Sequence, residues 1–94
     1  LFLNMTRAIV RVHVTSEFEK EFKRLPSHIQ KTGGKKDALF RKNVFDMRLR
    51  THKLKGELDG YWSYSVNYEY RILFRFISDN EVVYYDIGTH EIYK

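Results

Sequence analysis

The feature that most restricts the fold of this chain is the alternation of side chains at residues 70–77. In an extended strand, successive side chains point to opposite faces of the sheet. One face of this strand is apolar and largely aromatic, with Ile72, Phe74 and Phe76. The other face carries Arg71 and Arg75. We expect the aromatic face to pack against helices and the opposite face to stay more open, where Arg71 can meet a phosphate and Arg75 is solvated.

Shorter patterns predict the remaining elements. Residues 8–14 alternate as a strand, and further strands are expected at 61–67 and 81–87. Asp79-Asn80 is a hairpin signal between the last two strands. Residues 44–60 are expected to form an irregular, basic connection.

Two capping-box pairs predict the starts of two helices: Ser16 with Glu19, and Ser27 with Gln30. Gly33-Gly34 predicts a kink or a frayed turn within the second helix, because each glycine there costs about 1 kcal/mol relative to alanine. The residues of this helix expected to be buried are Ile29, Ala38, Leu39 and Phe40. The order β-α-α-β-β-β predicts an α+β fold in which an N-terminal helical hairpin packs on one face of a small, antiparallel-rich sheet.

Length and composition narrow the class of protein. Residues 1–94 fit a single domain, with residues 1–6 expected to be a disordered or extended leader. No stretch approaches the roughly 20 apolar residues of a membrane span, so no membrane partner is expected. The chain has no cysteine, which suits a reducing, cytoplasmic location.

The net charge of +5 is concentrated in one segment. Between residues 31 and 55 the only acidic side chains are Asp37 and Asp46. The basic side chains of that segment are Lys31, Lys35, Lys36, Arg41, Lys42, Arg48, Arg50, Lys53 and Lys55. A local excess of this kind is typical of a surface that binds the phosphates of a nucleic acid.

The four histidines do not form a metal motif. Metal sites usually show paired ligands at short spacing, and His13, His28, His52 and His90 show none, so we expect no metal and no other cofactor. His13 and His28 are expected to be structural or exposed. His52 opens a basic run, and His90 follows Gly88-Thr89 at the end of a strand, where functional residues often lie.

Such a set of residues is suited to cutting RNA without a metal. A histidine can act as base or acid near neutral pH, and arginine or lysine can stabilise the charge that develops on the phosphate. An aromatic ring can stack on an unpaired base, and Tyr93, near the end of the chain, is the tyrosine we expect to do so.

Four blocks in order resemble the RelE/YoeB/YafQ superfamily of toxins from type II toxin–antitoxin systems. They are His52-Lys53-Leu54-Lys55-Gly56, Gly60-Tyr61-Trp62-Ser63, Tyr70-Arg71-Ile72-Leu73-Phe74 and Gly88-Thr89-His90-Glu91-Ile92-Tyr93. The segment from Phe18 to Pro26 is similar to the first helix of the family. The resemblance covers nearly the whole chain and implies a microbial-ribonuclease-like fold. It also implies cleavage of messenger RNA in the ribosomal A site and neutralisation by a cognate antitoxin protein.

The resemblance also implies roles for individual residues. Arg71 matches the family's phosphate-binding arginine, and His90 matches its C-terminal acid. His52 corresponds to a base candidate, so we assign His52 as base, Arg71 as clamp on the transition state and His90 as acid. Lys53 and Lys55 would contact RNA, and Tyr93 lies near a tyrosine that lines the site. The chain departs from YafQ-like members at Ser63 and Ser65, where they have ionisable residues.

Two other functions remain open from the sequence. ParE-like proteins share the fold and inhibit DNA gyrase by binding, although they typically lack the histidine–arginine set. The chain could also be a catalytically inactive relative that only binds an antitoxin. The expected partners of the nuclease are the antitoxin, messenger RNA and ribosomal RNA, with the basic segment of the second helix contacting ribosomal RNA.

Overall fold

The computed structural model describes residues 6–93, with side chains up to Ile92. Its helices are α1 (Ser16–Arg24) and α2 (Ser27–Lys42), and its strands are β1 (Arg11–Val14), β2 (His52–Lys53), β3 (Trp62–Ser65), β4 (Arg71–Ser78) and β5 (Glu81–Gly88). Three short 3₁₀ turns complete it: η1 (Met47–Leu49), η2 (Gly56–Leu58) and η3 (His90–Tyr93). The predicted α+β class is confirmed. Of the predicted leader, only Thr6 lies within the described residues.

The strands form one sheet in the order β1-β5-β4-β3-β2. β1 pairs with β5 in parallel, and every other pairing is antiparallel. The predicted hairpin at Asp79-Asn80 joins β4 to β5. β2 was not predicted, because residues 44–60 were expected to be irregular. Two residues are too few to show an alternating pattern, and β2 exists because the free edge of β3 offers hydrogen-bonding partners.

Both helices begin at the predicted residue, but neither uses the predicted cap. Thr15, not Ser16, caps α1 by accepting a hydrogen bond from the backbone N–H of Phe18 (3.0 Å). At α2 the cap is Pro26, which has no side-chain acceptor. The side chain of Gln30 instead donates to the carbonyl of Leu25 (2.9 Å), at the end of α1. The capping-box residues therefore mark the starts of the helices correctly, but they do not form the N-caps.

α2 continues through the two glycines without a break. Gly33 is buried against α1, and a Cβ atom there would lie 3.1 Å from Cε1 of Phe22. The glycine thus allows the two helices to approach closely. Of the four residues of α2 expected to be buried, Ile29 and Phe40 are buried, Leu39 is half-buried and Ala38 is exposed.

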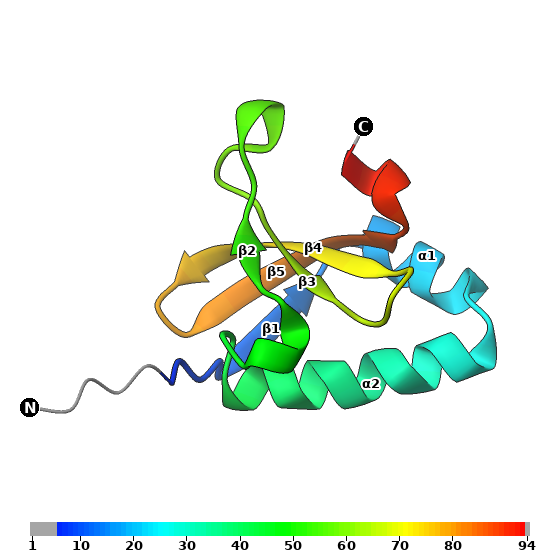
Figure 1. The fold of residues 1–94 in the computed structure, drawn as a ribbon, viewed down its shortest axis with the longest axis horizontal. Coiled ribbons are helices and arrows are strands. Elements are labelled where there is room, and N and C mark those ends of the chain that lie inside the picture. The colour runs from blue at the N-terminus through cyan, green and yellow to red at the C-terminus, as the bar shows by residue number, and fades with distance from the viewer. Residues whose placement is uncertain (1–5, 94) are drawn as a thin grey trace, which may run out of the picture.

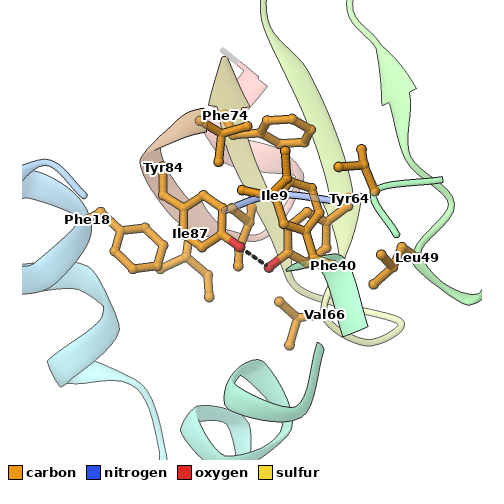
Figure 2. Packing of buried hydrophobic residues seen from close by; sticks show 12 residues of the cluster. Ile9, Phe18, Phe40, Leu49, Tyr64, Val66, Phe74, Tyr84 and Ile87 are labelled. Atoms are coloured by element: carbon orange, nitrogen blue, oxygen red, sulfur yellow. Dashed lines mark hydrogen bonds between the residues drawn. The ribbon is translucent and has the colours of Figure 1, made fainter. Parts of the chain in front are cut away.

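The core lies between the helices and one face of the sheet, as Figure 2 shows. The ring of Phe40 stacks on that of Tyr64, with centroids 4.6 Å apart, and meets Phe74 edge-on at 4.9 Å. Tyr84 of β5 completes this aromatic cluster. The face of β4 that carries Phe74 is thus the helix-covered face, as the alternation predicted, and Arg71 lies on the opposite face.

Two segments rise from the helix-free side of the sheet, as Figure 1 shows. One is the loop around η2, between β2 and β3, and the other is the C-terminal turn η3. Helix α2 lies on the other side of the sheet. Among residues 6–93 no helix is long and apolar enough to cross a bilayer.

Candidate active site

Arg71 is held in place by the turn that precedes it. The side chain of Asn67 accepts hydrogen bonds from the backbone N–H groups of Glu69 (2.9 Å) and Tyr70 (2.8 Å), which fixes the turn between β3 and β4. The turn then directs three backbone carbonyls at one nitrogen of the guanidinium. Nη1 of Arg71 donates to the carbonyls of Asn67 (2.9 Å), Tyr68 (3.2 Å) and Tyr70 (3.3 Å).

This anchoring leaves much of the guanidinium available for a ligand. All the side-chain hydrogen bonds of Arg71 to described residues come from Nη1, and no ion pair joins it to an acidic side chain of that part of the chain. A guanidinium has five N–H donors, so Nε and Nη2 can still donate to an anion. Arg71 is thus fixed in position without an ion pair to any acidic side chain that the structure describes.

Arg71 and His90 line the same hollow. In the sheet Arg71 pairs with Gly88, the last residue of β5, so the chain that follows passes beside the guanidinium. Gly88 is required there, because a Cβ atom would lie 2.5 Å from Cγ2 of Ile92. The glycine lets η3 fold back on the end of β5 and brings His90 beside Arg71. The hollow has a volume of about 460 Å³ and is lined by Tyr68, Glu69, Arg71, Thr89, His90 and Glu91.

A second hollow, of about 330 Å³, lies on the other side of Arg71. Its lining is strongly basic: Lys36, Arg48, Arg50, Ser65, Asn67, Tyr68 and Arg71. Arg71 and Tyr68 belong to both hollows. We call the hollow that contains His90 the histidine hollow, and the hollow that contains Lys36 and Arg50 the basic hollow.

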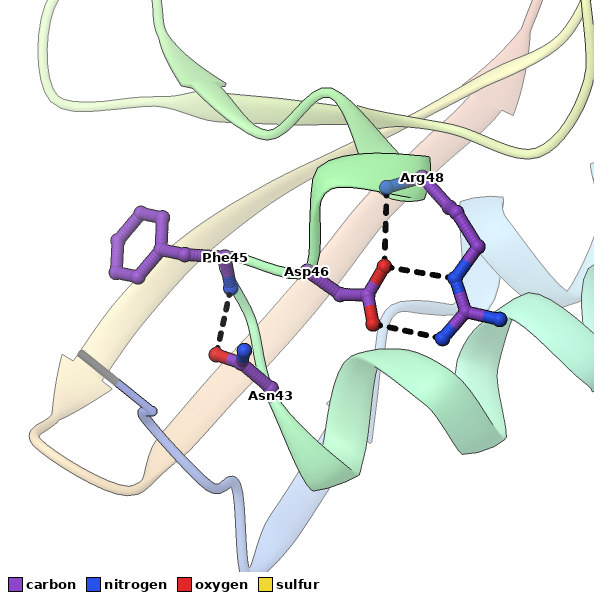
Figure 3. A network of polar contacts seen from close by, with 4 residues as sticks. All are labelled: Asn43, Phe45, Asp46 and Arg48. Atoms are coloured by element: carbon purple, nitrogen blue, oxygen red, sulfur yellow. Dashed lines mark hydrogen bonds and ion pairs between the residues drawn. The ribbon is translucent and has the colours of Figure 1, made fainter. Parts of the chain in front are cut away.

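Arg48 is the one cation of the basic hollow with an ion pair among the described residues. Its Nε and Nη2 donate to the two carboxylate oxygens of Asp46 (3.0 and 2.9 Å), as Figure 3 shows. Asp46 also accepts the backbone N–H of Arg48 (2.9 Å), which caps η1. The Arg48 side chain, and next its backbone N–H, lower the pKa of Asp46 from 3.8 to about 2.

His52 lies at the edge of the sheet, in β2, and lines neither hollow. It pairs with Ser63, which pairs in turn with Leu73 of β4, so the register puts the His52 side chain on the helix-free face with Arg71. Two strand spacings, roughly 10 Å, separate β2 from β4. Nδ1 of His52 lies 2.9 Å from the carbonyl of Arg50. Because a carbonyl only accepts, this contact puts the proton of a neutral ring on Nδ1 and leaves Nε2 as a free acceptor.

The remaining RNA-binding candidates are spread over the same region. Lys53 is exposed and pairs with Trp62, whose ring lies on the helix-covered face, so Lys53 is directed away from Arg71. Lys55 is exposed and precedes η2. The side chain of Tyr93 lies outside the described residues. The structure thus brings Arg71 and His90 together and leaves His52, Lys53 and Lys55 on or beside β2.

The sequence did not identify several residues that the fold brings to this site. Tyr68 is 96% exposed and stands between the two hollows, and Glu69 and Glu91 add carboxylates beside His90. Lys36 reaches the site from α2, a contact over a long sequence distance that no local pattern reveals. Arg50 was predicted only as one cation of the basic segment, and the sequence did not place it beside Arg71. Among the described residues no cluster of three or more metal-ligating side chains is found.

Comparison with solved structures identifies the fold. The toxin–antitoxin complex RelBE2 of Mycobacterium tuberculosis contains a chain with a TM-score of 0.75 and 19% identity, covering 93% of this chain and 98% of that one. The YoeB/ParE toxin of Agrobacterium tumefaciens has a TM-score of 0.72 and 18% identity, covering 86% of this chain and 99% of that one. YafQ of E. coli has a TM-score of 0.69 and 15% identity, covering 87% of this chain and 94% of that one.

Sequence comparison gives the family. A search of the curated proteins finds no match. The family model of HigB-like toxins, described as RelE-like toxins of the type II toxin–antitoxin system HigB, matches residues 13–90. This match begins within β1 and spans both helices and the other four strands, and it includes every lining residue of the two hollows except Glu91. The chain therefore belongs to the family of HigB-like toxins, which are RelE-like toxins of type II toxin–antitoxin systems.

Proposed function

We propose that this toxin is a metal-independent endoribonuclease that cleaves messenger RNA on the ribosome. The observation that supports this most is the shared hollow of Arg71 and His90. Phosphodiester cleavage by a 2′-hydroxyl requires a base, an acid and a group that stabilises the developing charge. Arg71, fixed by backbone carbonyls, and His90, able to transfer a proton, can supply two of these three.

In the proposed reaction the ribose 2′-oxygen attacks the adjacent phosphorus as its proton is removed, and the bond from phosphorus to the 5′-oxygen breaks. Arg71 donates Nε–H and Nη2–H to the phosphate oxygens, where negative charge increases in the transition state. His90, protonated, gives a proton to the departing 5′-oxygen. The products are a 2′,3′-cyclic phosphate and a 5′-hydroxyl.

We propose His52 as the base that takes the proton of the 2′-hydroxyl. It shares the helix-free face with Arg71, and its contact with the Arg50 carbonyl leaves Nε2 able to accept a proton. Glu69 is the competing base, because it is already in the histidine hollow. The variants His52→Gln and Glu69→Gln decide between them: the cleavage rate falls at least a hundredfold in the variant that removes the base.

The partners of the proposed enzyme are messenger RNA, ribosomal RNA and a cognate antitoxin protein. The likeness to a chain of a toxin–antitoxin complex supports the antitoxin. The exposed cations Lys35, Arg41 and Lys42 of α2 are proposed to contact ribosomal RNA. Lys36, which was predicted to do so with them, lines the basic hollow instead. Lys53 and Lys55 are proposed to contact phosphates of the message. Because Lys53 is directed away from Arg71, its phosphate would lie outside the two hollows. Tyr93 is proposed to stack on a base.

Primer extension on a message translated in a cell-free extract tests the proposed function. The nuclease produces cuts in phase with codons, and chloramphenicol or omission of ribosomes reduces them. An intact message together with blocked supercoiling by DNA gyrase would instead identify a gyrase inhibitor. An intact message, normal supercoiling and retained antitoxin binding would identify an inactive relative.

A further inference from the structure

We propose that the basic hollow binds the phosphate of the nucleotide next to the cleaved linkage. This inference rests on the proposed function, because it extends the RNA path from the histidine hollow across Arg71 to Lys36 and Arg50. It assigns to Lys36 and Arg50 the task of holding the message in register, separate from the chemistry.

The charge of the basic hollow is the first observation that supports a phosphate. Four of its seven lining residues are cations and none is acidic. Asp46 neutralises Arg48 through a two-point contact. No ion pair joins Lys36, Arg50 or Arg71 to a described residue, so three positive charges line one concave surface. Arginine and lysine in this arrangement bind phosphate oxygens by charge-assisted hydrogen bonds.

The backbone of Arg50 is the second observation. It has a φ of 52° and a ψ of 40°, the left-handed conformation that glycine and asparagine adopt more readily than arginine. It is also the only described residue other than glycine with a positive φ. This backbone conformation is energetically unfavourable for arginine. Residues held in unfavourable backbone conformations concentrate at functional sites. Here the conformation directs the chain from η1 into β2 and leaves the Arg50 side chain at the basic hollow.

The position of Arg71 and Tyr68 shows which polyanion fits. Both residues line both hollows, so one ligand that fills the two must pass over them. A single RNA strand has phosphates at regular intervals and a base between them that can stack on an exposed ring. A free phosphate would fill only one hollow. An acidic peptide has no base that would stack on the Tyr68 ring. The experiment below distinguishes such a peptide from RNA.

The test measures the binding of a short RNA that cannot be cleaved. The probe is an oligonucleotide with a 2′-O-methyl group at the attacking position. Two further probes each carry one uncharged methylphosphonate linkage, on the 5′ or the 3′ side of the scissile phosphate. The unmodified toxin should bind one of these two about tenfold more weakly than the fully charged probe, because that probe lacks one charge-assisted hydrogen bond.

The variant Lys36→Gln with Arg50→Asn should remove this discrimination. It should bind the charged probe about tenfold more weakly and bind the charged and methylphosphonate probes equally. The slope of log Kd against log salt should fall by about 0.7 for each phosphate that the variant no longer binds. Asparagine is chosen at residue 50 because it accepts the left-handed conformation, and an unchanged melting temperature shows that the fold is kept.

The control variant Lys20→Gln with Arg11→Gln removes the same net charge from exposed residues outside both hollows. It should keep the tenfold discrimination. The inference is overturned if the Lys36/Arg50 variant discriminates as well as the unmodified toxin, or if the control discriminates as poorly as that variant. It is also overturned if the Lys36/Arg50 variant binds RNA normally but no longer binds its antitoxin.

Failure of the inference can be told apart from failure of the proposed function. If the toxin cuts messages on the ribosome and the Lys36/Arg50 variant keeps the discrimination, only the basic hollow has been assigned wrongly. If the toxin neither cuts messages nor binds the charged probe, both proposals fall.

Discussion

The hydroxyl oxygens of Tyr64 and Tyr84 lie 2.9 Å apart in the centre of the core, as Figure 2 shows. Tyr84 donates its proton to Asp37 (2.7 Å), and a hydroxyl has only one proton, so Tyr64 must donate to Tyr84. Arg41 in turn donates to the other oxygen of Asp37 (3.0 Å). This chain of contacts connects β3, β5 and α2. Burial raises the pKa of both tyrosines, so they stay protonated.

The direction of these hydrogen bonds predicts unequal costs for two similar substitutions. Tyr84→Phe leaves the buried Tyr64 hydroxyl without an acceptor and one oxygen of Asp37 without a donor, and should lower the free energy of unfolding by about 2–3 kcal/mol. Tyr64→Phe keeps the contact between Tyr84 and Asp37 and should cost about 1 kcal/mol. Urea denaturation measures both values. Equal costs would show that the assigned direction is wrong.

The two glycines of α2 predict a second contrast. A Cβ atom at Gly34 would meet nothing within 4 Å, so Gly34→Ala should raise the free energy of unfolding by about 1 kcal/mol through helix propensity. At Gly33 the new methyl group would crowd Phe22 at 3.1 Å, and this should cancel or reverse the gain. Thermal and urea denaturation of the two variants, side by side, measure the difference. A larger gain from Gly33→Ala would contradict the close packing of α1 against α2.

The sequence predicts the layers of this fold better than it predicts the site. The alternation in residues 70–77 correctly separated the helix-covered face from the face that carries Arg71. This was possible because the side chains of a single strand show which of its faces is buried. β2 could not be predicted, since its pairing depends on the free edge of β3. The cap at Thr15 was missed by one residue because Ser16 shows the same local signal.

The candidate site depends on contacts between distant segments. Gly88 with His90 could be identified near a strand end, and Arg71 on the open face. Lys36 was predicted as an RNA contact of the basic segment, but its place beside Arg71 could not be predicted, because that depends on how α2 crosses the sheet. The left-handed conformation of Arg50 could not be predicted either, since arginine does not favour it.

Asp46 predicts a dependence of stability on pH. Its contacts with Arg48 lower the pKa of the folded state to about 2, below the ordinary value of 3.8. The ion pair therefore stabilises the fold above about pH 4, and the stabilisation is lost as the pH falls from about 4 to about 2. Asp46→Asn should make the free energy of unfolding depend less steeply on pH over this range, and Arg48→Gln should do the same. Urea denaturation from pH 2 to pH 5 checks this, and unchanged slopes in both variants would count against the pair.

Tyr68 should contribute to RNA binding through its ring alone. It is 96% exposed, so its aromatic surface can receive a base without displacing other side chains. Stacking of one base is worth about 1–3 kcal/mol, so Tyr68→Ala should weaken binding of the uncleavable RNA at least about fivefold. Tyr68→Phe should bind as well as the unmodified toxin. Fluorescence anisotropy at one fixed salt concentration measures this, and weaker binding by the phenylalanine variant would point to the hydroxyl instead.

Arg71 and His90 should both be needed for cleavage, for different reasons. His90→Gln removes the proton donor and should slow cleavage by about 10²–10⁴ with little change in RNA binding. Arg71→Ala removes the charge that stabilises the transition state and should slow cleavage by about 10²–10³ while also weakening binding. Arg71→Lys should recover part of the rate, because lysine keeps the charge but lacks the fork of donors.

Arg75→Ala is the matched control for Arg71→Ala, because Arg75 lies on the same strand and face but lines neither hollow. It should cut messages at the normal rate. Growth arrest without antitoxin and primer extension on the message give the activity, and thermal melting shows whether each variant is folded. If Arg71→Ala and His90→Gln stay fully toxic and still cut, the chemistry does not take place in the histidine hollow. The groups that stabilise the charge and supply the proton would then have to be sought elsewhere on the helix-free face, near β2 and His52.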